Sequence, residues 1–179
     1  MDQTWQEYGI TKAGDHENGT ELNQFSDPWG FYVDDEDETI YVADTDNHRI
    51  VLWKGNATDG LIVAGGNGQG SRNDRLNKPT KMTVDKQNDS LIISDSGNIR
   101  IVRWPRQNGT SGEVLILLVA CWNLMMDSDG YLYVPDMVQN RVVRWKMGEN
   151  FTPVAGGTRR GDRLDQFNRT SPIFIDDDH

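Results

Sequence analysis

Four side chains that could take part in chemistry occur within six residues of the chain: Asp44, Asn47, His48 and Arg49. A carboxylate, an imidazole and a guanidinium at this spacing suit general acid–base catalysis or the binding of a charged ligand. The same segment returns twice, but the histidine does not. The copies contain Asp95, Asn98 and Arg100, and then Asp136, Asn140 and Arg141. Because the proton-transfer group is lost on repetition, the pattern predicts a structural role for the segment and no catalytic residue.

The repeated aspartate is predicted to accept backbone N–H groups in a tight turn, with the arginine that follows as its ion-pair partner. A tryptophan closes each copy of the segment. These rings are expected to pack between neighbouring structural units, where a large aromatic side chain buries much area. The three tryptophans are Trp53, Trp104 and Trp145.

The elements that must position these residues are short strands. Apolar and polar residues alternate on both sides of each polar turn, which is typical of a β-hairpin. The hairpins are expected at residues 39–53, 90–104 and 131–145. A further strand is predicted before each hairpin, at 28–34, 79–85 and 122–127, and another after it. The repeating unit therefore has four strands, a to d, in which b and c form the hairpin.

The spacing of the units identifies the architecture. Trp53 and Trp104 are 51 residues apart, whereas Trp104 and Trp145 are 41 residues apart. The shortfall of ten lies between strand d of the second unit and strand a of the third, where the glycine-rich segment 65–70 has no counterpart. The apolar run 114–122 at this place is predicted to be a buried strand. Four antiparallel strands in 40 to 50 residues are typical of a β-propeller blade.

The repeated pattern also resembles a known family. It runs Pro-x-Gly, three apolar residues and Asp, then Tyr-Val-Ala-Asp-x-x-Asn-His-Arg-Ile, Trp and Val-Ala-Gly-Gly, and this resembles NHL repeats over residues 5–179. Ile99 replaces the histidine in the second unit, and Pro135 interrupts strand b of the third. The resemblance implies an all-β fold, a β-propeller of four-stranded antiparallel blades. Since such propellers usually close with six blades, it implies half of a six-bladed ring.

The expected division of this single partial propeller follows the repeat. Residues 5–25 are the end of a preceding blade, 26–75 the first blade, 76–120 the second, 121–166 the third, and 167–179 the first strand of a fourth. Three blades by themselves would leave sheet edges open. We therefore expect either a longer chain with further blades or the pairing of two half-rings.

Other candidates for chemistry are weak. The segment 65–70 lacks the Lys-Ser/Thr of a phosphate-binding loop. Cys121 lies between Ala120 and Trp122, which is typical of a small core residue. The histidines (His16, His48 and His179) are scattered, whereas a zinc site needs convergent ligands. The acidic runs 34–38 and 176–178 are interpreted as solvated loops, with a cation site as the alternative. No cofactor and no metal site are predicted.

Charge and composition limit the partners. The net charge is −10, which argues against nucleic acid, because nucleic-acid binding needs a basic surface. No apolar run approaches the length of a membrane-spanning helix, and no signal peptide is visible at the N-terminus. Six Asn-x-Ser/Thr sequons occur, at Asn18, Asn56, Asn88, Asn108, Asn150 and Asn168. Asn56, Asn108 and Asn150 follow the tryptophans, in loops between strands c and d. Either these are turn sequences copied with the repeat, or the chain is glycosylated and enters the secretory pathway.

The function predicted from these observations is a non-catalytic binding scaffold for a protein or a glycan. In a propeller the b–c and d–a loops emerge on one face, and four of the sequons fall on the other. The first face is therefore the predicted binding face, with Arg72, Arg75, Arg159 and Arg160 as candidate contacts. A metal-dependent propeller enzyme of the lyase or lactonase type is the alternative, and RNA binding is disfavoured by the charge.

Overall fold

A computed structural model describes residues 11–14, 17–157, 159–168 and 173–175 of the chain. The strands form three four-stranded antiparallel sheets. The first sheet contains β1 (Pro28–Asp34), β2 (Thr39–Asp44), β3 (Arg49–Lys54) and β4 (Leu61–Gly65). The second contains β5 (Pro79–Asp85), β6 (Ser90–Asp95), β7 (Arg100–Pro105) and β8 (Glu113–Leu117), with a 3-10 turn η1 (Ser96–Asn98) between β6 and β7. The third contains β9 (Met125–Met126), β10 (Leu132–Asp136), β11 (Arg141–Trp145) and β12 (Thr152–Gly156).

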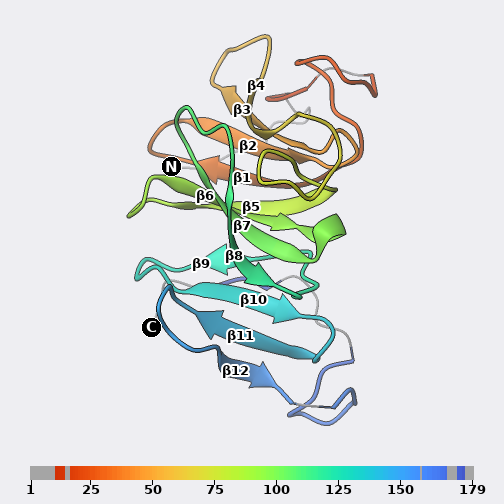
Figure 1. The fold of residues 1–179 in the computed structure, drawn as a ribbon, viewed down its shortest axis with the longest axis vertical. Coiled ribbons are helices and arrows are strands. Elements are labelled where there is room, and N and C mark those ends of the chain that lie inside the picture. The colour runs from red at the N-terminus through yellow and green to blue at the C-terminus, as the bar shows by residue number, and fades with distance from the viewer. Residues whose placement is uncertain (1–10, 15–16, 158, 169–172, 176–179) are drawn as a thin grey trace, which may run out of the picture.

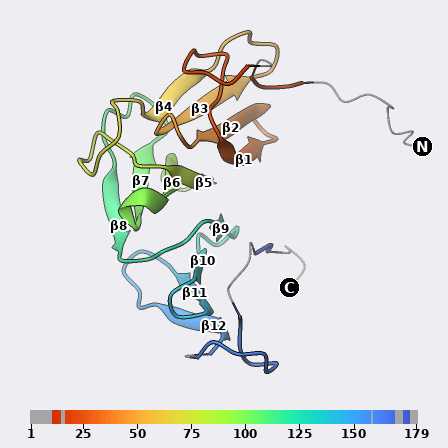
Figure 2. The same ribbon diagram turned by 90° about the vertical axis from the view of Figure 1, so that its right-hand side faces the viewer.

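The strand order in every sheet follows the chain, so each sheet is an up-and-down meander. The sheets stack along the long axis of the molecule (Figure 1). Turned by 90°, they fan out from one side, on which β1, β5 and β9 lie next to one another (Figure 2). This arrangement confirms the predicted fold class: the sheets are four-stranded antiparallel blades of a partial β-propeller. The two middle strands of each blade are the hairpin in which the repeated aspartate and arginine stand at paired positions, as in Asp44↔Arg49 and Asp95↔Arg100.

The core lies between the blades because each middle strand has apolar residues on both faces. One cluster joins the first two blades and includes Tyr41, Ile50, Leu91 and Trp104. The other joins the second and third blades and includes Ile92, Ile101, Leu132 and Val143. Strand β6 is buried at all six positions, since it belongs to the blade that has neighbours on both sides. Burial of apolar area at these two contacts is the main stabilising force of the assembly.

Strands β1 and β5 approach closely at Gly30. A Cβ atom added to Gly30 would lie 2.4 Å from the carbonyl oxygen of Thr80. Any other residue would push the two inner strands apart, so the absence of a side chain sets the contact between the first two blades.

The short connection from β8 to β9 differs from the sequence-based interpretation. The run 114–122 was predicted to be a buried strand, but β8 ends at Leu117. Leu117, Leu118 and Trp122 are 67%, 87% and 53% exposed. The prediction is confirmed for residues 114–117, which are in β8, and is wrong for 118–122, because an apolar run does not determine where a strand ends.

Strands are predicted at both ends of the chain, at 5–13 in the preceding blade and at 172–176 in the fourth, and only a few of their residues are described. Residues 11–13 and 173–175 are not in strands, and residues 5–10, 172 and 176 lie outside the described part. The blade boundaries that we expect and the completion of a ring stay predictions. In the described part of the chain, no helix is long and apolar enough to cross a membrane.

Candidate functional site: the face of the b–c and d–a loops

The repeated aspartate and arginine form a buried ion pair in the first two blades. Nε of Arg49 donates to Oδ2 of Asp44 at 2.6 Å, and their side chains are 7% and 0% exposed. Nε of Arg100 donates to Oδ2 of Asp95 at 2.7 Å, with side chains 6% and 0% exposed. The antiparallel register places the two residues opposite each other at the end of the hairpin. The hairpin alone therefore brings the two charges together, without contacts from other parts of the chain.

The outer nitrogens of Arg49 hold the loop that leads into the first blade. Nη1 donates to the carbonyl of Thr20, and Nη2 donates to those of Glu21 and Gln24. The side chain of Asn47 donates to the Gly19 carbonyl at 2.8 Å. One buried guanidinium thus satisfies three main-chain acceptors of a loop that has no strand partner.

The second blade repeats this arrangement one unit later. Arg100 donates to the carbonyls of Ser71, Arg72 and Arg75, and the side chain of Asn98 donates to that of Gly70. The two loops have the same internal hydrogen bond. The N–H of Gly19 donates to the Phe25 carbonyl, and the N–H of Gly70 donates to the Leu76 carbonyl. The motif that first suggested catalysis therefore fastens the d–a loops to the blades.

The third blade departs from this pattern. Arg141 Nε lies 3.7 Å from Oδ2 of Asp136, too far for a hydrogen bond, and this buried nitrogen has no acceptor among the described residues. Oδ1 of Asp136 instead accepts the N–H groups of Val138 and Gln139 in its own turn. The loop that Arg141 would hold is absent from the sequence.

The structure also places Asn140 differently from Asn47 and Asn98. Asn140 has a left-handed backbone with φ of 52°, as do His48 at 56° and Ile99 at 52°. It therefore occupies the histidine position of the motif, directly before the arginine, and Gln139 stands where the other blades have asparagine. Asparagine suits this position because it tolerates the left-handed region.

His48 has a structural contact. Its Nδ1 atom accepts the N–H of Lys78 at 3.1 Å, at the entry to the second blade. The Lys78 ammonium also lies 3.2 Å from Asp46 in the same turn. The imidazole thus links the first b–c turn to the next d–a loop. His16 and His179 lie outside the described residues.

The predicted contact arginines are on the d–a loops, but they are not alike. Arg72 is exposed and pairs with the carboxylate of Asp74 within its own loop. Arg75 is half-buried, and its Nε atom is buried without an acceptor in the described part. Arg159 is exposed, and Arg160 is exposed with its Nε donating to Asn168. Arg72 and Arg75 lie on the loop between β4 and β5, whereas Arg159 and Arg160 follow β12.

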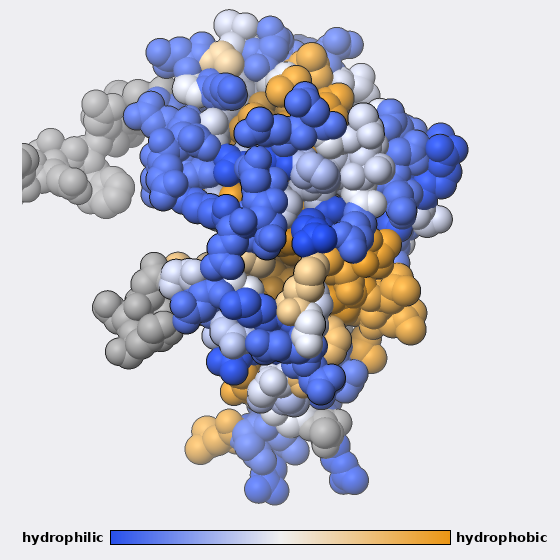
Figure 3. Space-filling view, turned by 60° about the vertical axis from the view of Figure 1, so that its left-hand side comes forward, coloured by the Kyte–Doolittle hydropathy of each residue, from blue (hydrophilic) through white to orange (hydrophobic). Residues whose placement is uncertain are grey.

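Sequence reasoning missed an apolar area on the same face. Ile99, Leu117, Leu118 and Val138 are 47%, 67%, 87% and 71% exposed. Arg100 pairs with Leu117, so Ile99 and Leu118 extend the same register beyond the strands. The Met137 N–H donates to the Ala120 carbonyl and so brings the third b–c turn against the β8–β9 connection. Figure 3 shows hydrophobic residues gathered about halfway down the molecule, at the height of β8.

Comparison with known proteins identifies the repeat. The model of the family described as NHL repeat matches residues 25–51, from the end of the first d–a loop to β3. The chain contains an NHL repeat. The matched segment includes the buried Asp44–Arg49 pair and Asn47, which are the residues that fasten the loop.

Solved structures share the fold of this NHL-repeat chain. Selenomethionine-substituted virginiamycin B lyase from Staphylococcus aureus is 14% identical with a TM-score of 0.51, over 75% of this chain and 43% of that one. A catalytically inactive variant of that lyase with quinupristin is 15% identical with a TM-score of 0.54, over 78% and 44%. A streptogramin B lyase is 18% identical with a TM-score of 0.52, over 71% and 40%. Comparison with curated protein sequences gave no match.

These identities establish a common fold only. The chain spans less than half the length of each of these lyases.

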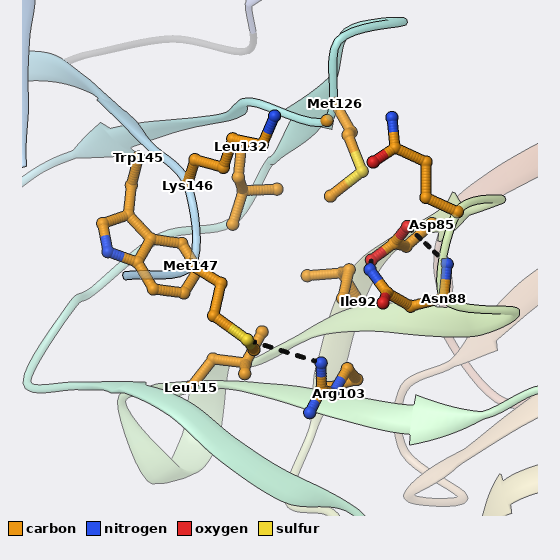
Figure 4. A pocket seen from close by; sticks show the side chains of 12 residues that line it. Asp85, Asn88, Ile92, Arg103, Leu115, Met126, Leu132, Trp145, Lys146 and Met147 are labelled. Carbon is orange, nitrogen blue, oxygen red and sulfur yellow. Dashed lines mark hydrogen bonds between the residues drawn. The ribbon is translucent and has the colours of Figure 1, made fainter. Parts of the chain in front are cut away.

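The opposite face of the blades has a pocket of about 90 Å³ between the second and third sheets. Ile92, Leu115, Leu132 and Trp145 form its apolar wall, and Figure 4 shows Met147 across its opening with the Met147 sulfur accepting from Arg103 at 3.7 Å. The residues that line the pocket come from several strands, so no local sequence pattern predicts the pocket. Its volume suits a few water molecules or a small apolar group.

The acidic run 34–38 is an exposed turn at residues 35–38, as interpreted from the sequence, but its first residue, Asp34, is buried in an ion-pair network between blades. Asp34 is 1% exposed, with Arg106 Nη2 at 3.2 Å and Lys86 Nζ at 3.6 Å. Arg106 also contacts Asp37, and Lys86 contacts Glu36. Both cations come from loops of the second blade, which only the tertiary structure places beside the run. Residues 176–178 lie outside the described part.

No group of three or more His, Cys, Asp or Glu side chains in the described ranges could hold a metal ion. All six sequon asparagines are exposed. Their glycosylation stays a prediction.

Cys121 is a buried core residue, 1% exposed, and burial raises the pKa of its thiol to about 11. The Ser94 hydroxyl lies 3.2 Å from its sulfur. The folded protein therefore holds the neutral thiol, which is a poor nucleophile.

The raised pKa predicts a loss of stability in alkali. The unfolded thiol ionises near pH 9 and the folded thiol near pH 11, so the contribution is complete below pH 9 and disappears as the pH rises through about 11. We expect the urea midpoint of the wild type to fall across this window more steeply than that of Cys121→Ala. Equal slopes for the two proteins would contradict the assignment. Reaction with a thiol reagent should also require unfolding.

Proposed function

We propose that this chain is a non-catalytic binding scaffold and that a partner protein binds to the face of the b–c and d–a loops. The observation that carries the proposal is the exposed apolar area of Ile99, Leu117, Leu118 and Val138 on this face. Contiguous exposed apolar residues rimmed by polar ones mark protein interaction sites. The rim here is supplied by the d–a loop that contains Arg72 and Asp74.

Leu118 gives the proposal its strongest support. It is 87% exposed and has a left-handed backbone with φ of 61°. A leucine at this position is unfavourable twice, because its side chain meets water and its Cβ is crowded in the left-handed region. The folded chain gains nothing from leucine there, whereas a bound partner would bury it.

The fixed loops support the same proposal. Arg49 and Arg100 hold the first two d–a loops through their carbonyls and leave the loop side chains directed outward. A preorganised surface loses less conformational entropy on binding than a mobile one. The buried carboxylates of Asp44 and Asp95 are occupied by these arginines, and the thiol of Cys121 is neutral, so the polar groups of this face serve to position loops.

The test compares two exposed leucines on opposite faces. We expect Leu118→Asn to reduce partner capture in a quantitative pull-down at least tenfold, with the thermal midpoint unchanged or raised, because asparagine tolerates the left-handed region. The matched control is Leu61→Asn: Leu61 is 59% exposed and begins β4 on the side of the c–d loop. A triple variant of Arg72, Arg159 and Arg160 to alanine tests the predicted contact arginines.

Equal loss of capture in Leu118→Asn and Leu61→Asn would contradict the proposed face. Metal analysis of the purified protein addresses the alternative prediction. Stoichiometric Ca²⁺ or Zn²⁺ that is required for capture would contradict a metal-free scaffold and favour the metal-dependent enzyme.

A further inference from the structure

The buried arginines of the first two blades bind their loops at identical sequence separations. Arg49 donates to carbonyls 29, 28 and 25 residues earlier, and Arg100 does the same. Counting back from Arg141 by these steps gives Gly112, Glu113 and Ile116, which belong to β8 or directly precede it. The third blade therefore keeps the arginine while the loop that it would bind is missing.

The side chain of Arg141 is more exposed than those of the equivalent arginines. Its side chain is 23% exposed, against 7% for Arg49 and 6% for Arg100. Its Nε atom is buried and has no hydrogen-bond acceptor among the described residues. In the other two blades Nε binds the aspartate and the Nη atoms bind the loop carbonyls, so the Nη donors of Arg141 are the groups that a segment in this place would satisfy.

The chain takes the shortest route across this gap. In the first blade, β4 ends at Gly65, and the loop that follows extends to Leu76 and Asn77. The N–H of Asn77 donates to the Asp95 carboxylate. In the second blade, β8 ends at Leu117, and Ala120 already contacts the next b–c turn through its carbonyl. Leu118 and Val138 are exposed in the two segments that this hydrogen bond joins, where the other blades have a d–a loop.

We propose that this gap is a docking site for an extended segment of a partner protein, which takes the place of the missing d–a loop. The segment presents main-chain carbonyl groups to the guanidinium of Arg141 and lays an apolar side chain on Leu118 and Val138. The proposal rests on the proposed function and specifies its mode of binding. The geometry favours main-chain carbonyls as the groups bound, because the equivalent arginines, Arg49 and Arg100, bind main-chain carbonyls in the other two blades.

The probe for the test is a synthetic peptide of residues 66–77, the loop that Arg100 holds in the second blade. The readout is the ¹H–¹⁵N resonance of the arginine Nε–H groups, with the Arg141 signal identified by its disappearance in Arg141→Lys. We expect the Arg141 signal to shift saturably with peptide, while those of Arg49 and Arg100 stay in place because their loops are already bound. Arg141→Lys should weaken the peptide about tenfold, since an ammonium lacks the planar fork of donors.

Two controls test the apolar part of the site. Leu118→Asn in the protein and Leu76→Ser in the peptide should each weaken binding several-fold. A peptide that leaves the Arg141 signal unmoved would overturn the proposal, as would one that moves the signals of all three arginines together. Self-association that Arg141→Lys abolishes would assign the gap to a second copy of this chain and overturn the separate partner. If the peptide fails while Leu118→Asn still abolishes partner capture, the proposed function stands without this mode of binding.

Discussion

Arg100→Ala is expected to lower the free energy of unfolding by about 3–5 kcal/mol, the loss typical of breaking one side of a buried ion pair. The substitution leaves the Asp95 carboxylate buried at 0% exposure without its cation. It also removes the donor from the carbonyls of Ser71, Arg72 and Arg75, so the second d–a loop loses its attachment. For a chain of this size, the thermal midpoint should fall by roughly 10 °C. Calorimetry and urea unfolding measure both quantities.

The matched control is the arginine at the same place in the third blade. Arg141 lies 3.7 Å from Asp136 and holds no loop, and the buried Asp136 carboxylate keeps two N–H donors of its own turn, so Arg141→Ala should cost less than Arg100→Ala, about 1–2 kcal/mol. The difference between the two variants measures what the loop contacts add to the repeated motif. Equal destabilisation by Arg100→Ala and Arg141→Ala would contradict the assignment of the loop-holding role to Arg100.

Trp104→Ala is expected to be the second strongly destabilising change, by about 3–5 kcal/mol. Trp104 is 2% exposed and belongs to the cluster between the first two blades. Its indole Nε1 donates to the Gly109 carbonyl at 3.0 Å, which fastens the c–d loop. The substitution leaves a large cavity at the contact on which the stacking of the blades depends, and urea unfolding measures the loss.

Two further variants separate packing from the hydrogen bond. Trp104→Phe keeps an aromatic ring and loses the Nε1 donor, so it should recover most of the stability. Trp122→Ala removes a tryptophan that is 53% exposed and meets Trp29 edge-on, with ring centroids 5.9 Å apart, so it should change the free energy of unfolding by about 0.5–1.5 kcal/mol. A Trp122→Ala variant as unstable as Trp104→Ala would contradict the position of the core.

The candidate site could be read from the sequence only in part. Repetition showed that Asp44, Asn47 and Arg49 build a hairpin, and the structure adds the carbonyls that Arg49 and Asn47 bind in the preceding loop. Those acceptors are main-chain atoms, which have no sequence signature. The ten-residue shortfall with a retained arginine was a visible signal of the gap at Arg141, but its meaning depends on knowing what the other two arginines hold.

Local patterns determined the elements by themselves. Alternation of apolar and polar residues, the polar turns and the repeat spacing are short-range properties, and they were sufficient for the hairpins, the four-stranded unit and the propeller class. The tertiary structure alone decided which loops meet. It placed Arg106 and Lys86 of the second blade beside Asp34 of the first, left Leu118 exposed, and left Nε of Arg141 without a hydrogen-bond acceptor among the described residues. These contacts join residues from different blades or repeat units, and their strength depends on burial and distance, which the order of residues along the chain does not specify.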